Sequence, residues 1–238
     1  MKVDLLVTCL TDTFRPRAAE ACVRLLEHLG CELGFPPEQT CCGQPLFNAG
    51  HEDEARDLAR RTAEVFRESE RVVTPSASCC AMIREHYPRL CPGEASVLAF
   101  VAKTQEFSEF LIDGLGLDPE EFAGRLQLTP RRFTWHDSCH LRALGSTGDR
   151  ALRFLLPVAE LDYAPLPNRE TCCGFGGVFA VDFPEISGAM LADKVTGVQE
   201  TGARILVCND AGCGLNLAGG LHRAGIRIRQ RHLAELLC

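Results

Sequence analysis

Long hydrophobic runs and an excess of positive charge are both missing from this 238-residue chain. No apolar run approaches the roughly 18 residues of a membrane-spanning helix, so we expect no membrane span. The formal net charge of -7 leaves no basic footprint, which argues against nucleic acid or an anionic membrane surface as a partner. The N-terminus lacks a basic stretch followed by a long apolar region, so we expect no secretory signal and a cytoplasmic protein.

Sequence motifs for several kinds of chemistry are absent as well. No phosphate loop, flavin fingerprint or Ser-His-Asp arrangement is evident, so we expect no catalytic residue for hydride removal in this chain. The closely spaced Cys-x-x-Cys run of ferredoxins is also missing. We therefore expect hydride removal to belong to a partner or to an undetected cofactor, and any connection to ferredoxin-type clusters to come from another subunit.

Cysteine, in contrast, is abundant, with 14 residues in the chain. Such a number suggests disulfides in a small secreted protein, but this chain is long and lacks a signal, so metal or redox chemistry is the better interpretation. Two vicinal pairs, Cys41-Cys42-Gly43 and Cys172-Cys173-Gly174, argue the same way. Neighbouring cysteines rarely meet good disulfide geometry with each other, whereas a metal cluster can use both thiolates.

Each vicinal pair is part of a longer motif that occurs twice. A lone cysteine precedes the pair by thirty-one or thirty-two intervening residues, and another follows it after thirty-six or thirty-nine. The two sets are Cys9, Cys41, Cys42 and Cys79 in the first half, and Cys139, Cys172, Cys173 and Cys213 in the second. The doubled spacing predicts two metal or redox sites.

The repeat extends over whole domains. The offset of roughly 130 residues lies far above the periods of solenoid repeats, so we infer a tandem duplication. The first cysteine-rich domain is expected at 1–120 and the second at 121–238. The segment 117–130, with its prolines, is the expected boundary.

Strand and helix patterns alternate within each half. Apolar spacing predicts helices at 17–29, 52–68, 148–156 and 183–201, and strands at 5–9, 72–73 and 205–208. This alternation predicts an α/β protein with two pseudo-symmetric Rossmann-like domains, each built on a parallel sheet. Loops at the carboxyl ends of parallel strands gather into one site, and the repeated cysteines fall in such expected loops.

Five short runs carry a resemblance to a known family. They are TCCGQP at 40–45, PSASC at 75–79, HDSCH at 136–140, CCGFGG at 172–177 and FPEIS at 183–187. The chain resembles the CCG-domain iron-sulfur proteins, which include the cysteine-rich subunit of heterodisulfide reductase and the iron-sulfur subunit of glycolate oxidase. It is most similar to the lactate-utilization subfamily, and the resemblance covers essentially the whole chain.

The resemblance implies an iron-sulfur electron-transfer subunit of a system that oxidises L-lactate, or a related 2-hydroxy acid, to pyruvate. It implies two clusters, with [4Fe-4S] favoured, each held by one set of four cysteines. Other subunits of a lactate-oxidising complex are the implied partners, so we expect an oxidoreductase subunit that is not catalytic alone. Clusters on exposed thiolate loops are often oxygen-labile and can be lost on aerobic purification.

The family motif in its fullest form ends each half in Cys-x-x-Cys, and here the chain departs from it. Ser76 and Asp210 stand three residues before the last cysteine of each set. Four thiolates suffice for an ordinary cluster, and an oxygen ligand from either residue would bind iron less tightly. The departure counts against a five-thiolate non-cubane cluster and the disulfide-cleaving chemistry linked to it.

Further residues near the motifs are candidates for tuning each site. Gly43, Gly174, Gly176 and Gly177 would let the backbone turn its N-H groups toward sulfur, which raises a reduction potential. His136 and His140 flank Cys139 and would tune a cluster or carry protons, or else serve as ordinary hydrogen-bonding histidines. Cys80 and Cys208 lie beside the expected loops without a counterpart in the other half, as ligands or as buried thiols. Cys22, Cys31, Cys91 and Cys238 are expected to be structural.

Three other functions stay open from the residues alone. A thiol-disulfide reductase component is one, although the missing fifth cysteine opposes it. Four cysteines also suit a structural zinc site in a binding scaffold. Vicinal thiols that oxidise reversibly would make the protein a redox sensor.

Overall fold

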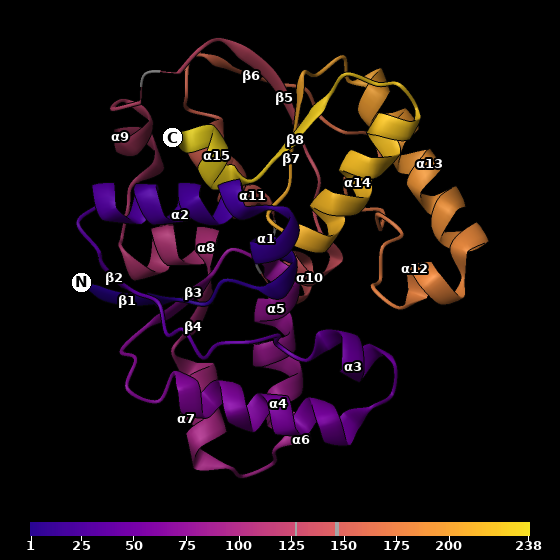
Figure 1. Cartoon of the computed structure of the whole chain (residues 1–238). Helices are drawn as coiled ribbons and strands as arrows, with labels where there is room; N and C mark the ends of the chain where they lie inside the picture. Colours follow the sequence, from indigo (N-terminus) through magenta and orange to yellow (C-terminus); the bar gives the residue numbers. More distant parts are fainter. Residues whose placement is uncertain (127, 146–147) are drawn as a thin grey trace. The chain divides into compact units, whose positions relative to one another are not determined.

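The computed structural model describes residues 1–126, 128–145 and 148–238 and divides into two compact units (Figure 1). The first unit contains residues 1–107 together with Cys238, and the second contains residues 108–237. The expected boundary segment 117–130 includes residue 127, which lies outside the described residues. No helix in the described part of the chain is long and apolar enough to cross a membrane.

The first unit is built on a four-stranded parallel sheet with the order β2-β1-β3-β4. Its strands are β1 (Lys2–Leu5), β2 (Glu32–Gly34), β3 (Val72–Thr74) and β4 (Thr104–Glu106). Its helices are α1 (Cys9–Phe14), α2 (Pro16–His28), α3 (Gln44–Asn48), α4 (Glu52–Val65), α5 (Ala77–Ala81), the π-helix η1 (Met82–His86), α6 (Tyr87–Leu90) and α7 (Ala95–Ala102).

The second unit repeats this sheet with the order β6-β5-β7-β8, again parallel throughout. Its strands are β5 (Arg131–Trp135), β6 (Leu161–Tyr163), β7 (Ile205–Val207) and β8 (Arg229–Arg231). Its helices are α9 (Pro119–Ala123), α10 (Cys139–Ala143), α11 (Gly148–Leu155), α12 (Phe179–Asp182), α13 (Pro184–Glu200), α14 (Ala211–Arg223) and α15 (Leu233–Leu237). The short helix α8 (Phe107–Glu109) and the π-helix η2 (Phe110–Gly114) follow β4. The matching strand orders confirm the prediction of two repeated Rossmann-like α/β domains.

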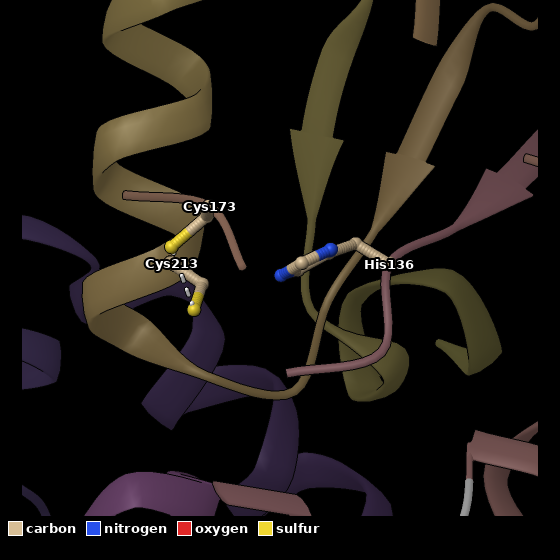
Figure 2. Close-up of side chains that lie close together, drawn as sticks. All are labelled: His136, Cys173 and Cys213. Carbon is tan, nitrogen blue, oxygen red and sulfur yellow. Dashed lines mark hydrogen bonds between the residues drawn. The ribbon is translucent and has the colours of Figure 1, made fainter. Parts of the chain in front are cut away.

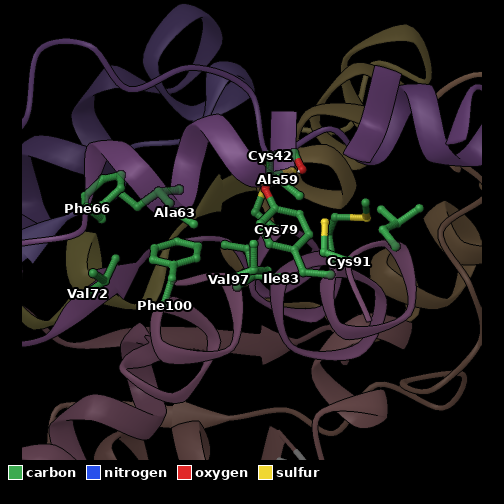
Figure 3. Packing of buried hydrophobic residues seen from close by; sticks show 14 of the residues in the cluster. Cys42, Ala59, Ala63, Phe66, Val72, Cys79, Ile83, Cys91, Val97 and Phe100 are labelled. Atoms are coloured by element: carbon green, nitrogen blue, oxygen red, sulfur yellow. Dashed lines mark hydrogen bonds between the residues drawn. The ribbon is translucent and has the colours of Figure 1, made fainter. Parts of the chain in front are cut away.

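The hydrophobic core of the first unit reaches the cysteines. Helix α4 buries Ala55, Ala59 and Ala63 in this core, where it packs against α6 and α7, and its helical spacing predicted the buried stripe. Cys42 and Cys79 belong to the same buried cluster, in which Phe100 also packs (Figure 3). In the second unit Cys173 and Cys213 likewise lie in the buried cluster formed by α13, α14 and β7. Two thiols of each set are therefore fixed by core packing.

The strand predicted at 5–9 lies earlier in the chain than expected, at Lys2–Leu5. β1 ends at Leu5, and Cys9 is the first residue of α1, just as Cys139 is the first residue of α10. A short polar residue before each cysteine explains the difference, because such residues favour the start of a helix. Ser138 shows this directly, since its hydroxyl accepts a hydrogen bond from the N-H of Leu141 at 3.2 Å.

The last cysteines of the two sets also lie in helices, although loops were predicted for them. Cys79 and Cys213 each occupy the third position of a helix, α5 and α14. The backbone N-H groups in the first turn of a helix have no partner within that helix and carry partial positive charge. In α14 the carboxylate of Asp210 takes up one of these N-H groups, and contacts with Cys173 and Cys208 raise the pKa of the Cys213 thiol.

Candidate metal centres

The four thiols of the first set lie together beyond the carboxyl ends of β1, β2 and β3. The Sγ atoms of Cys9 and Cys41 are 3.6 Å apart, and those of Cys42 and Cys79 are 3.1 Å apart. The thiols of Cys41 and Cys42 also interact with each other, which links the two contacts into one cluster. Cys42 and Cys79 are buried, whereas Cys9 is exposed, so the cluster opens to solvent on one side.

The second set has the same arrangement. The Sγ atoms of Cys173 and Cys213 are 3.0 Å apart, and the thiol of Cys172 interacts with those of Cys139 and Cys173. Cys173 and Cys213 are buried, while Cys139 and Cys172 are partly buried. The structure thus brings together all eight cysteines that the repeat singled out, in two groups of four.

The glycine after each cysteine pair makes a tight turn toward the first thiol. The N-H of Gly43 donates to Cys41 Sγ at 3.5 Å, and that of Gly174 donates to Cys172 Sγ at 3.4 Å. Both glycines have left-handed φ angles, of 85° and 83°. A side chain is strained in that conformation, and a Cβ atom on Gly174 would also lie 2.7 Å from the carbonyl oxygen of Ser187.

A polar side chain holds the carbonyl group of the second cysteine in each pair. The Tyr87 hydroxyl donates to the Cys42 oxygen at 2.9 Å, and Asn216 Nδ2 donates to the Cys173 oxygen, also at 2.9 Å. Sequence reasoning missed both residues, because neither lies in a repeated motif and their types differ between the halves. The two peptide groups are nevertheless fixed in the same way.

One thiol in each set is held as a thiolate. Hydrogen bonds from the thiols of Cys42 and Cys9, with the Gly43 N-H, lower the pKa of Cys41 to about 3. Hydrogen bonds from Cys139 and Cys173 lower the pKa of Cys172 to about 2 in the same manner. Each cluster of thiols therefore presents a negative sulfur, which is the form that binds metal ions.

A histidine faces the second set (Figure 2). The ring of His136 follows β5, is 1% exposed, and places a nitrogen so that it, Cys173 Sγ and Cys213 Sγ all lie within 4.8 Å of one another. Burial, and then the nearby charge of Lys194, lower the pKa of His136 to about 3. The ring is therefore neutral at physiological pH and can donate a nitrogen lone pair.

Lys194 brings positive charge to the second set, and sequence reasoning missed it. Its side chain is fully buried, and its Nζ donates to the carbonyl oxygens of Asn168 and Arg169. Burial lowers the pKa of Lys194 to about 8, while the thiols of Cys173 and Cys172 act in the opposite direction. The signal in the sequence was a lysine close to the apolar residues Leu191, Val195 and Val198 of one predicted helix.

The other residues that the sequence singled out near the cysteines make different kinds of contact. Asp210 Oδ1 accepts the N-H of Cys213 at 2.9 Å and so caps α14, whereas Ser76 Oγ lies 3.2 Å from Ser78 Oγ. His140 Nδ1 lies 3.6 Å from Cys139 Sγ. Gly176 and Gly177 adopt left-handed φ angles of 53° and 63° just before α12.

The cysteines outside the two sets are mostly buried. Cys208 is buried, and its thiol interacts with that of Cys213. Cys80 is buried within α5, one residue after Cys79. The four cysteines expected to be structural divide into buried Cys22, Cys31 and Cys91 and exposed Cys238.

Although the chain has a negative net charge, several arginines lie close together in the second domain. An open hollow of about 1090 Å³ at the amino ends of β5, β7 and β8 is lined by Arg131, Arg204, Arg227, Arg229 and Arg231. The alternation of arginine at 227, 229 and 231 was the signal, because alternate residues of a strand share a face. The hollow is at the opposite end of the strands from the cysteines.

The donor atoms suit a metal-thiolate group. Two thiolates on one tetrahedral ion are roughly 3.8 Å apart, given metal-sulfur bonds near 2.3 Å. The observed contacts of 3.0–3.6 Å between neighbouring thiols are slightly shorter than this. Four convergent thiols, one of them ionised, fit either a single tetrahedral ion or an iron-sulfur cluster.

Comparison with known proteins identifies one matching segment in each half of the chain, and each segment contains one set of four cysteines. The family model described as "Cysteine-rich domain" (CCG) matches residues 3–84 and 133–218. Proteins named "Lactate utilization protein A" match the full chain. The protein from Geobacillus kaustophilus is 43% identical to this chain, which covers 98% of its length. The protein from Halalkalibacterium halodurans is also 43% identical, with 96% of its length covered. The protein from Bacillus subtilis is 40% identical, with 99% of its length covered. A solute-binding protein of an ABC transporter system from Conexibacter woesei covers 95% of this chain and 68% of its own at 16% identity, but its TM-score of 0.31 supports no argument.

Proposed function

The chain belongs to the CCG cysteine-rich domain family, and from this premise we propose that it is an iron-sulfur electron-transfer subunit of a system that oxidises L-lactate, or a related 2-hydroxy acid, to pyruvate. The observation that carries the proposal is the convergence of four thiols in each domain, twice in one chain. The names of the relatives, which mention lactate utilization, support lactate as the substrate in this proposal.

The residues have distinct roles in this proposal. Cys9, Cys41, Cys42 and Cys79 would hold one cluster, and Cys139, Cys172, Cys173 and Cys213 the other. When bound, an iron-sulfur cluster stores and releases single electrons. The Gly43 and Gly174 N-H groups point at sulfur and offset part of the negative charge that reduction adds. The exposed side of the first set gives an electron-transfer partner access to Cys9.

The electron count suits a chain with two sites. L-lactate loses two electrons and two protons when it becomes pyruvate. In the proposal another component of a cytoplasmic lactate-oxidising complex removes the pair, and the two thiol sets of this chain accept one electron each. The proposal also favours [4Fe-4S] clusters, because four thiolates are the usual ligand number for them.

Anaerobic purification with iron and sulfide analysis tests the proposal. Visible and electron paramagnetic resonance (EPR) spectra are recorded before and after addition of L-lactate with the candidate partner subunits. Two matched variants, Cys41→Ser/Cys42→Ser and Cys172→Ser/Cys173→Ser, should each retain about half of the iron if each set binds one cluster. A protein that contains neither iron nor sulfide, or a cluster that stays oxidised with lactate and every partner, would refute it.

A zinc scaffold is the second candidate, and the short sulfur-sulfur distances favour it. A mononuclear ion requires less opening of the thiols than a cluster of several irons does. Stoichiometric zinc without sulfide, in protein that has no visible absorption, would establish this alternative.

A further inference from the structure

The ring of His136 is the one candidate donor in the second site that no hydrogen bond explains. Both of its nitrogens, Nδ1 and Nε2, are buried, and neither makes a hydrogen bond of normal geometry among the described residues 1–126, 128–145 and 148–238, although the Arg169 backbone lies near enough to raise the pKa of the ring. Native proteins pair nearly all buried polar groups, because an unpaired one has lost its contact with water and gained nothing in return. At least one ring nitrogen therefore has no partner of normal geometry in the described part of the chain.

The position of the ring indicates what kind of partner it lacks. The nitrogen of His136 and the sulfurs of Cys173 and Cys213 lie within 4.8 Å of one another, and Figure 2 shows the ring directed toward the two thiols. Nitrogen and sulfur ligands of one tetrahedral ion are about 3.5 Å apart, so the three atoms are close to a ligand arrangement. We propose that His136 is a metal ligand of the second site, which is thereby a mixed imidazole-thiolate centre.

The first domain has no donor at the position equivalent to His136. His136 and Leu6 both stand three residues before the first cysteine of their sets, and Leu6 is a buried core residue. The repeat therefore places an apolar side chain in one domain where the other has an imidazole. The first site would be purely thiolate, and the two centres of the chain would differ chemically.

Asp210 is a weaker candidate for the additional donor. It occupies the position at which the family motif has a further cysteine, but its Oδ1 accepts the N-H of Cys213 and caps α14. His136 reaches the thiols from the end of β5, on another segment of the chain. The imidazole, and not the carboxylate, is thus the extra donor that the fold directs at the site.

A neutral imidazole changes the charge of the centre. Replacement of cysteine by histidine raises the reduction potential of iron-sulfur centres, because a neutral ligand stabilises the reduced state better than an anionic one. Lys194 adds positive charge on the same side. If the centres are iron-sulfur clusters, which rests on the proposed function, the second domain has the higher potential and electrons pass from the first domain to the second.

Pulsed EPR on full-length protein with 15N-labelled histidine tests the ligand assignment. The Cys41→Ser/Cys42→Ser background leaves only the second site to be loaded, and the reduced protein is expected to show a strongly coupled 15N nucleus. The mirror background, Cys172→Ser/Cys173→Ser, is expected to show none. Absence of strong coupling from the second site in the reduced protein would overturn the assignment while leaving the proposed function intact.

Two substitutions identify the nitrogen. His136→Leu introduces the residue that the first domain has at this position and is expected to abolish the coupling, whereas His140→Ala is expected to retain it. Loss of the coupling in His140→Ala and its survival in His136→Leu would assign the nitrogen to the wrong histidine and end the proposal. The unsubstituted protein alone decides the question if His136→Leu does not fold.

Cobalt titration covers the case in which the protein holds no iron. Metal-free protein in the Cys41→Ser/Cys42→Ser background is titrated with Co²⁺, and His136→Leu should weaken binding by at least about tenfold, since even outer partners of metal ligands contribute that much. Equal affinity for Co²⁺ with and without His136 would refute the ligand role. A failure of the proposed function would be recognised independently of this titration, because the purified protein would then contain neither iron nor sulfide.

Discussion

The hydroxyl of Tyr87 donates a hydrogen bond to the carbonyl oxygen of Cys42 across 45 positions of sequence, at a distance of 2.9 Å. Tyr87 is fully buried at the start of α6, so this contact ties the cysteine pair to the core of its domain. Asn216 makes the same contact with Cys173 in the second domain. The two domains thus use different residues to hold the carbonyl group of the second cysteine in each pair.

Substitution of Tyr87 by phenylalanine should weaken the first domain. The change leaves a buried carbonyl without this donor, and we expect a loss of about 1–3 kcal/mol in the free energy of unfolding of metal-free protein, measured by urea denaturation. Asn216→Ala serves as the matched change in the second domain. Iron loss should follow the substituted domain in each case, and loss of iron from both sites in either variant would contradict the assignment.

Alanine should be tolerated less well at Gly174 than at Gly43. Both positions require a left-handed φ, which costs a residue with a side chain about 1–2 kcal/mol. At Gly174 the new Cβ would also clash at 2.7 Å with the Ser187 carbonyl, whereas at Gly43 the nearest atom lies at 3.5 Å. Gly30→Ala, with φ 80° and open space around the Cβ, is the control for the backbone cost alone. Equal melting temperatures for the Gly174 and Gly30 variants would contradict the close contact.

The thiols of metal-free protein should differ in their response to pH. The pKa of Cys41 is lowered to about 3 and that of Cys172 to about 2, so both are thiolates throughout the range from pH 5 to 8. Their alkylation by iodoacetamide should hardly change across that range. Exposed Cys238 has a raised pKa, and its labelling should increase about tenfold with each pH unit. Peptide mass spectrometry of timed samples measures all three, and parallel pH profiles would contradict the prediction.

Replacement of Lys194 by methionine should lower the reduction potential of the second site. Removal of a buried positive charge disfavours the more negative reduced state, and a shift of roughly 60 mV would correspond to a tenfold change in a one-electron equilibrium. Lys103→Met is the control, because Lys103 donates to the carbonyls of Arg67 and Ser69 on the first domain. Redox titration followed by EPR measures both, and an unchanged potential in Lys194→Met would contradict an electrostatic role.

Much of the fold follows from regularities of the sequence. The doubled cysteine spacing predicts the repeated domain, and the alternation of helix and strand patterns predicts the parallel sheets. The ends of the elements were harder to predict, because Thr8 and Ser138 start helices at positions where the apolar runs suggested longer strands. Short polar residues override apolar continuity there, since they favour the conformation that precedes a helix.

The surroundings of the thiols depend on contacts between distant residues, which no local pattern contains. Tyr87 and Asn216 reach cysteines more than forty positions away, and they differ in chemical type. Lys194 occupies the buried face of α13, a place where a charged residue is rarely found. The orientation of the His136 ring toward Cys173 and Cys213 likewise depends on where β5 ends relative to these two cysteines, which are distant in sequence.

The distribution of each thiol set over three separate parts of its domain has a consequence for the biogenesis of the protein. In the first domain the four cysteines follow β1, β2 and β3, and those of the second domain follow β5, β6 and β7. The four sulfurs therefore meet only after the strands have paired, and a newly made or partly unfolded domain offers isolated cysteines. If the chain binds metal, we therefore expect loading to be coupled to the folding of each domain, because the four sulfurs are brought together only there.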